Sequence, residues 1–162
     1  MRQINFFRCW FTISIVLAGG ALTGCKPVEI STSYGVVAGL QDESLTWFLG
    51  IPFAAAPVGD LRWADTQPPQ RWQGVYMATA RKPACVQMMT FPTAQGSQED
   101  CLTLNVWSPR TPGPHPVMFW IHGGADLAGS GNEPEYDGSD LATSQDVVVV
   151  SINYRLHLTG FF

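Results

Sequence analysis

In the sequence Val117-Met118-Phe119-Trp120-Ile121-His122-Gly123-Gly124-Ala125, an unbroken apolar run ends in a pair of glycines. A second run, from Val147 to Asn153, is also nearly continuous in apolar residues. Strands that are hydrophobic on both faces belong in the interior of a sheet that helices cover. A short helix is expected between the runs, near Ser139 to Gln145. Together they predict a parallel strand, crossover, strand unit, and therefore an α/β fold.

The residues before this unit predict further strands and a long loop. The β-branched and aromatic runs Ile30 to Leu40 and Leu45 to Phe53 flank four polar residues, which favours an antiparallel hairpin. Residues 54 to 73 contain three prolines and predict a loop. Leu102 to Trp107 is another expected strand. The predicted sheet is mixed and mostly parallel, with an antiparallel hairpin at its start.

Composition limits the protein to one ordinary domain and excludes several function classes. The chain has 162 residues, of which 46% are hydrophobic and only 14% charged, so a disordered chain is not expected. The net charge is −4 and the basic residues are scattered, which argues against a nucleic-acid partner. Between Thr111 and Tyr154 all charged residues are acidic, which fits either a solvated face or an ion site.

Residues 1–24 are typical of an export signal. Arg2 and Arg8 border the apolar run Cys9 to Ala18, which small residues follow. The sequence Leu22-Thr23-Gly24-Cys25 is similar to the bacterial lipobox, in which cleavage exposes a lipid-carrying cysteine. We therefore expect a lipid on Cys25, a tether over residues 25–32, and a periplasmic or outer-membrane lipoprotein. The alternative is a plain secretory signal with Cys25 as an incidental thiol.

Two cysteines remain in the body of the chain, Cys85 and Cys101. In an oxidising periplasm they are expected to pair, and the alternative is two buried thiols that never meet. Neither has a Cys or His neighbour at metal-ligand spacing, so a structural zinc is not expected.

The small residues after the first apolar run are candidates for catalytic chemistry. At Gly123, Gly124 and Ala125 the backbone can turn so that its N–H groups point into a cavity, where they can stabilise an oxyanion. The alternative is an ordinary tight turn after a strand. We assign His122 a structural role in supporting this turn rather than that of a general base.

Five blocks in order resemble the type B carboxylesterase/lipase family, from about residue 33 to the end of the chain. The blocks are Val58-Gly59-Asp60-Leu61-Arg62, residues 99–109 (EDCLTLNVWSP), the turn at 122–125, Tyr136-Asp137-Gly138 and residues 151–156 (SINYRL). The resemblance implies an α/β-hydrolase fold and the hydrolysis of small carboxylic esters by an activated serine, with no cofactor and no metal.

The resemblance also assigns roles to individual residues. It makes the N–H groups of Gly124 and Ala125 oxyanion donors, and it implies a disulfide between Cys85 and Cys101. It further implies a structural ion pair between Arg62 and Glu99. A second structural arginine, at position 155, would find its partner later in the family's chain.

The sequence departs from the family in two ways. No serine has a glycine both two places before and two places after it, so the catalytic serine, acid and histidine are missing. We therefore expect residues 33–162 to be a partial domain, truncated before the nucleophile elbow and inactive alone. The alternatives are a non-catalytic binding or adhesion protein on the same fold, or a truncated pseudogene product. Asp126 either opposes the developing negative charge or turns to solvent.

Overall fold

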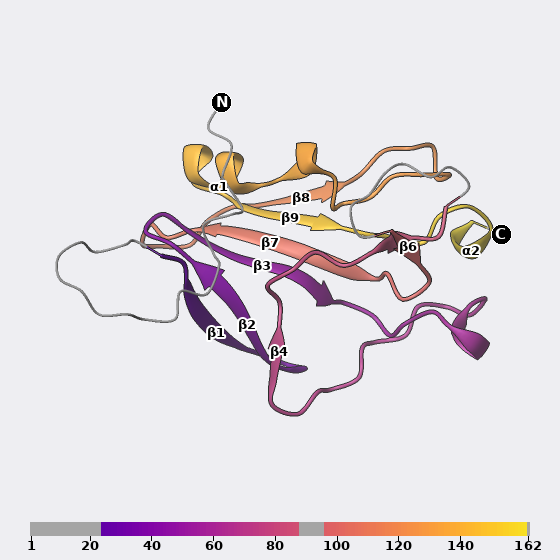
Figure 1. The fold of residues 1–162 in the computed structure, drawn as a ribbon. Helices are drawn as coiled ribbons and strands as arrows, with labels where there is room; N and C mark the ends of the chain where they lie inside the picture. The colour runs from indigo at the N-terminus through magenta and orange to yellow at the C-terminus, as the bar shows by residue number, and fades with distance from the viewer. Residues whose placement is uncertain (1–23, 88–95, 162) are drawn as a thin grey trace, which may run out of the picture.

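The computed structural model describes residues 24–87 and 96–161. Its main element is a twisted sheet with the strand order β1-β2-β3-β7-β9-β8, and β4 pairs with β2 (Figure 1). The strands of this sheet are β1 (Lys26–Thr32), β2 (Gly35–Gln41), β3 (Leu45–Pro52), β4 (Val75–Met77), β7 (Thr103–Pro109), β8 (Val117–Ile121) and β9 (Val148–Ile152). A small second sheet pairs β5 (Ala84–Cys85) with β6 (Ser97–Gln98). The helical elements are η2 (Gly59–Leu61), η3 (Pro134–Tyr136), α1 (Ser139–Gln145) and α2 (His157–Gly160).

The sheet is mixed, as predicted, but the described part is more antiparallel than the sequence suggests. The pairs from β1 through β2, β3 and β7 to β9 are all antiparallel. Only β8 with β9 and β2 with β4 are parallel. Parallel neighbours need a crossover connection, and the first strands of the chain are joined mainly by tight turns.

The predicted crossover unit is confirmed. The strands β8 and β9 run parallel as neighbours, and α1 between them has the bounds that the sequence predicted. The Asp137 carboxylate accepts the Ser139 N–H at 3.0 Å where the helix begins, and Asp146 ends it in the left-handed region. Ala142 is fully buried and packs with Trp107 and Val149, which fixes α1 on β7 and β9.

The predicted interior position of Val117 to His122 is wrong for β8. This strand lies at the edge of the sheet, and all five of its residues are exposed. Helix α1 lies on one face of the sheet over β7 and β9 (Figure 1). On β8, Trp120 contacts Tyr136 of η3, with ring centroids 5.3 Å apart. Phe119 remains 55% exposed. Within the described residues no strand pairs with the outer edge of β8, and the face that carries Val117, Phe119 and Ile121 is left uncovered.

The expected tether over residues 25–32 is also wrong, because Lys26–Thr32 forms β1. It pairs antiparallel with β2 over all seven of its residues. Val28 packs against the buried cluster of Val37 and Phe48, while the other β1 residues are exposed, so pairing with β2 is what orders the segment. A turn at residues 33–34 divides the predicted Ile30 to Leu40 run into two strands.

The antiparallel hairpin of β2 and β3 is confirmed, with Leu40 opposite Trp47. Its turn is held by the Asp42 carboxylate, which accepts the N–H groups of Ser44 and Leu45 at 2.8 Å each. Residues 54–73 form a loop with the single turn η2, and Leu102 to Trp107 falls mostly within β7.

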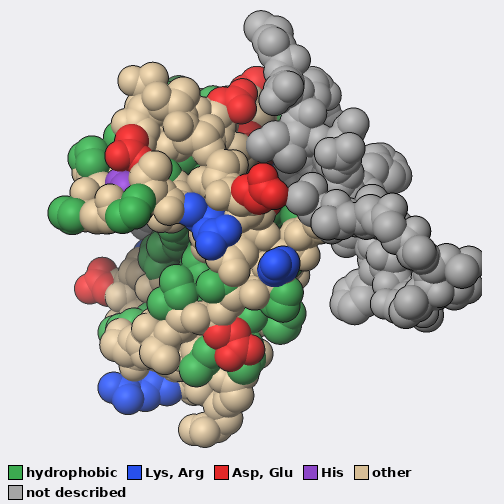
Figure 2. Space-filling model, turned by 90° about the vertical axis from the view of Figure 1, so that its left-hand side faces the viewer, with side chains coloured by type: hydrophobic (Ala, Val, Ile, Leu, Met, Phe, Trp, Pro, Cys, Tyr) green, Lys and Arg blue, Asp and Glu red, His purple; other side chains and the backbone are tan. Residues whose placement is uncertain are grey.

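The export signal falls largely on residues 1–23, outside the described residues. The structure has Cys25 disulfide-bonded. No helix of the described chain combines the length and the apolar character needed to cross a membrane. Figure 2 shows acidic, basic and hydrophobic side chains interspersed on one face, without a continuous positive surface there.

Candidate active site

The turn after β8 exposes backbone donors. Residues 123–127 are exposed, and Gly124, Ala125 and Asp126 all have positive φ, of 127°, 53° and 61°. The turn closes on itself, because the Gly124 carbonyl accepts the N–H groups of Leu127 at 3.0 Å and Ala128 at 3.2 Å. Within residues 24–87 and 96–161, the N–H groups of Gly124 and Ala125 donate to no acceptor.

Only glycine fits the first of these donor positions. A Cβ on Gly124 would overlap the carbonyl oxygen of Ala128, and its φ of 127° is rarely adopted by residues with a side chain. The backbone is therefore tightly folded at Gly124, where a side chain would collide with the peptide group of Ala128.

The buried side chain of His122 supports this turn. The side chain is buried and stacks on the ring of Tyr154, with centroids 4.4 Å apart. Its Nδ1 lies 2.8 Å from the Gly123 carbonyl oxygen, so this nitrogen carries the ring proton. The Tyr154 hydroxyl donates to the His122 carbonyl oxygen at 2.8 Å. Burial lowers the pKa of His122, which keeps the ring neutral and suits a supporting role.

Asp126 lies on the exposed side of the turn. Its carbonyl oxygen accepts the His157 N–H at 2.6 Å, which ties the turn to the start of α2. Burial, and then the negative charge of Asp126, raise the pKa of Tyr154. The exposed carboxylate is screened by water, and this weakens its effect on a charge at the turn.

A buried amide network lies behind the turn, and sequence reasoning missed it. The Asn153 side chain accepts the Ser130 hydroxyl and the Gly131 N–H at 3.0 Å each, and donates to the Pro83 carbonyl at 3.2 Å. Ser130 and Asn153 are almost fully buried. Asn153 thus joins the end of β9 to the segment that follows the turn.

A second buried amide continues this network into the sheet. The Asn105 side chain donates to Asn132 at 2.8 Å and to Ser151 at 3.1 Å, and accepts the Gly50 N–H at 3.0 Å. Polar residues inside otherwise apolar strands, such as Asn105 and Ser151, were the available sequence signal. Buried polar groups of this kind are normally hydrogen-bonded.

The Cys85–Cys101 disulfide is confirmed. The Cα atoms are 4.9 Å apart, and both cysteines are buried with Ala54, Leu102 and Leu156. This cluster fixes β5 against the start of β7.

Arg62 and Glu99 form a bidentate ion pair beside the disulfide. The guanidinium Nη2 donates to Oε2 at 2.8 Å, and Nε donates to Oε1. Hydrogen bonding from Arg62 lowers the pKa of Glu99. Both side chains are partly exposed, so the pair fixes geometry more than it stabilises the fold.

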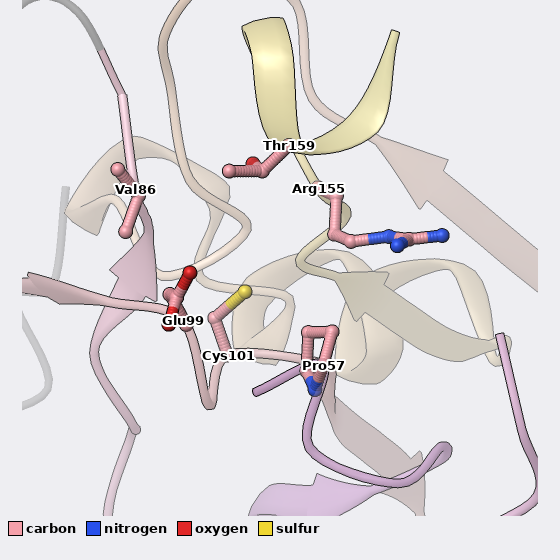
Figure 3. A pocket seen from close by; sticks show the side chains of 6 residues that line it. All are labelled: Pro57, Val86, Glu99, Cys101, Arg155 and Thr159. Carbon is pink, nitrogen blue, oxygen red and sulfur yellow. The ribbon is translucent and has the colours of Figure 1, made fainter. Parts of the chain in front are cut away.

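Arg155 finds partners within the described chain, earlier than the resemblance implied. It donates to the carbonyl oxygens of Arg62 at 3.2 Å and Ala64 at 3.0 Å, and to the Thr66 hydroxyl at 3.3 Å. Figure 3 shows Arg155 and Glu99 around a small pocket. Its volume of about 10 Å³ has room for about one water molecule, so it is a small gap where loops meet and is too small to be a substrate site. The described residues hold no cluster of three or more His, Cys, Asp or Glu side chains suited to a metal ion.

Known proteins resemble this chain over nearly its whole described length. A sequence model of the Carboxylesterase family matches residues 26–162. Fumonisin B1 esterase of Sphingopyxis macrogoltabida is 47% identical over 135 residues, covering 80% of this chain and 25% of that protein. Para-nitrobenzyl esterase of Bacillus subtilis (strain 168) is 43% identical over 138 residues, covering 82% of this chain and 28% of that protein.

Solved structures agree. A PNB esterase superimposes with a TM-score of 0.78 at 43% identity, over 82% of this chain and 29% of the esterase. A carboxylesterase of Geobacillus stearothermophilus gives a TM-score of 0.75 at 46% identity, over 82% of this chain and 27% of that chain. These neighbours confirm the expected amino-terminal part of an α/β-hydrolase fold. The chain spans about a quarter to three-tenths of the length of these relatives, and it belongs to the carboxylesterase family.

Proposed function

We propose that this chain is the amino-terminal part of a serine hydrolase of carboxylic esters and supplies two oxyanion-hole donors, the N–H groups of Gly124 and Ala125. The observation that carries the proposal is that these N–H groups are exposed at the end of β8 and donate to no acceptor among the described residues. Membership of the carboxylesterase family supports an ester as the substrate.

The chemistry assigns these donors a defined step. A serine hydroxyl attacks the ester carbonyl, a base takes the hydroxyl proton, and the carbonyl oxygen gains the negative charge. Two N–H groups held beside that oxygen would stabilise the charge without having to reorganise during the reaction. Removing one such donor typically lowers kcat by about 10²- to 10³-fold.

The attacking serine is proposed to lie in polypeptide outside this chain. None of the serines here has the G-x-S-x-G spacing of a nucleophile elbow, and the relatives are about three times as long as this chain. The chain alone is therefore expected to be inactive, and to form a site only with a segment that carries the serine, the acid and the histidine.

The test has two arms, both using a p-nitrophenyl ester of a short-chain acid. The 162-residue chain should release no nitrophenol above the buffer rate. The product of the full reading frame should hydrolyse the ester and lose that activity when its elbow serine is replaced by alanine. A frame without such a serine, or a full-length product that leaves the ester intact, would refute the hydrolase proposal.

We also propose that the protein is exported and anchored by a lipid on Cys25, which would place it in the bacterial periplasm or at the outer membrane. The support is the lipobox-like sequence of residues 22–25. The sulfur that is disulfide-bonded in the structure would have to be a thiol when the lipid is attached. In cell fractionation, Cys25→Ser should move the protein from the membrane to the soluble fraction, and unchanged membrane retention would exclude the anchor.

A further inference from the structure

The side chain of Gln87 holds both polar groups of the Gly129 backbone. The Gly129 N–H donates to Gln87 Oε1 at 2.9 Å, and Gln87 Nε2 donates to the Gly129 carbonyl oxygen at 3.3 Å. Two bonds from one carboxamide to one residue fix its orientation as well as its position. The contact joins segments 42 residues apart in the sequence.

Gly129 in turn lies directly against the start of the oxyanion turn. It is buried, with a φ of 117°. A Cβ at this position would lie 2.5 Å from His122 Nδ1 and 2.6 Å from the Gly123 carbonyl oxygen. The preceding carbonyl, that of Ala128, occupies the space beside Gly124 in the same way. The placement of residues 128 and 129 therefore determines where the peptide groups of residues 123 and 124 can lie.

The backbone next to Gln87 is fixed by the disulfide and by buried packing. Gln87 follows β5 and lies two residues after Cys85, which the disulfide to Cys101 fixes within a buried cluster. Its Nε2 also donates to the Cys85 carbonyl oxygen at 3.1 Å, so the carboxamide is oriented from its own strand. A side chain held in this way can fix the position of Gly129 relative to the Cys85–Cys101 disulfide.

We propose that Gln87 is a positioning residue for the oxyanion turn, acting through Gly129 to set the direction of the Gly124 and Ala125 N–H groups. The turn keeps its shape because Gln87 holds it at Gly129 and His122 holds it at Gly123. Among the described residues, the side-chain hydrogen bonds of Gln87 go to Cys85 and Gly129 and not to the two donors themselves. The proposal rests on the proposed function for its catalytic consequence, but the positioning can be measured without turnover.

The first experiment measures hydrogen exchange of the full-length protein over residues 123–129 by mass spectrometry. The Leu127 and Ala128 N–H groups report on the closed turn, because both donate to the Gly124 carbonyl. Gln87→Ala should raise exchange of this segment at least about tenfold, while the peptides of β7 and β9 keep their protection. The matched control is Gln98→Ala, an exposed glutamine whose Nε2 donates to the Asp100 carbonyl at 2.7 Å, and it should change nothing.

The second experiment measures ester hydrolysis by the same variants. Gln87→Ala should lower kcat by about 10- to 100-fold with KM little changed, because a small misplacement of donors affects the transition state most. Gln87→Glu keeps the Oε1 acceptor for the Gly129 N–H and should recover part of the lost kcat. A purely structural role would instead speed exchange throughout the sheet and show no such rescue.

The outcomes separate the two proposals. If Gln87→Ala leaves exchange of residues 123–129 at the wild-type rate, or loosens β7 and β9 equally, the positioning role is wrong. If the wild-type protein hydrolyses no ester, the proposed function fails, and the exchange data still decide whether Gln87 holds the turn.

Discussion

Replacing Asn153 by alanine should destabilise the protein strongly, because one buried side chain serves three partners. Asn153 is 2% exposed, and its Oδ1 accepts bonds from Ser130 and Gly131 while its Nδ2 donates to Pro83. The truncation leaves the buried Ser130 hydroxyl and Gly131 N–H without this acceptor. A buried polar group left unsatisfied costs about 1–3 kcal/mol. Two such groups give an expected loss of about 2–6 kcal/mol, a large part of the stability of an ordinary domain.

Equilibrium unfolding in urea measures this loss as a change in the free energy of unfolding. Gln98→Ala is the control, because it removes one exposed hydrogen bond and should change the free energy by about 0.5 kcal/mol or less. A loss below about 1 kcal/mol for Asn153→Ala would contradict this expectation, since water or a shifted backbone would then satisfy the same groups.

Three further predictions concern the disulfide, pH and the exposed carboxylate. The double variant Cys85→Ala/Cys101→Ala should lose about 3 kcal/mol of unfolding free energy in urea, because the disulfide closes a loop between residues 16 apart in sequence and so restricts the unfolded chain. An unchanged urea midpoint would contradict this. Burial places the pKa of His122 below its ordinary 6.5, so its stabilising contribution should be present above pH 6.5 and fall as the pH drops below that value; His122→Gln should flatten this part of the urea midpoint-against-pH curve, and an unchanged slope would argue against burial. Asp126→Asn should alter the kcat for ester hydrolysis by the full-length protein by less than about threefold, because the carboxylate is exposed to water, and a larger increase in kcat would show that its charge reaches the oxyanion.

Local signals in the sequence were sufficient for elements that are set by neighbouring residues. Helix α1 has the bounds that the sequence predicts, and the residues that fix its two ends, Asp137 and Asp146, are close neighbours in the chain. The β2–β3 hairpin was predicted for the same reason, since its turn depends on Asp42.

Features set by distant partners could not be predicted in the same way. The apolar character of β8 indicated burial, but burial depends on what pairs with its outer edge and covers its second face. The strand β1 looked like a tether because its order comes from pairing with β2 and not from its own composition.

The sequence did not predict the side chains that hold the turn and the segment after it, for a related reason. Gln87 and Asn153 reach partners 22 to 70 residues away, and nothing near either residue in the sequence marks those contacts. Only the backbone donors at Gly124 and Ala125 were visible in advance, through the small residues after an apolar strand and through the family resemblance.

The proposed chemistry depends on the Ala125 N–H donating to the oxyanion of an ester undergoing hydrolysis. Replacing the peptide bond before Ala125 by an ester, through incorporation of lactic acid in the full-length protein, removes this hydrogen and leaves the side chain unchanged. Steady-state hydrolysis of a p-nitrophenyl ester should then show kcat lowered by about 10²- to 10³-fold with KM nearly constant. An undiminished kcat would contradict the claim.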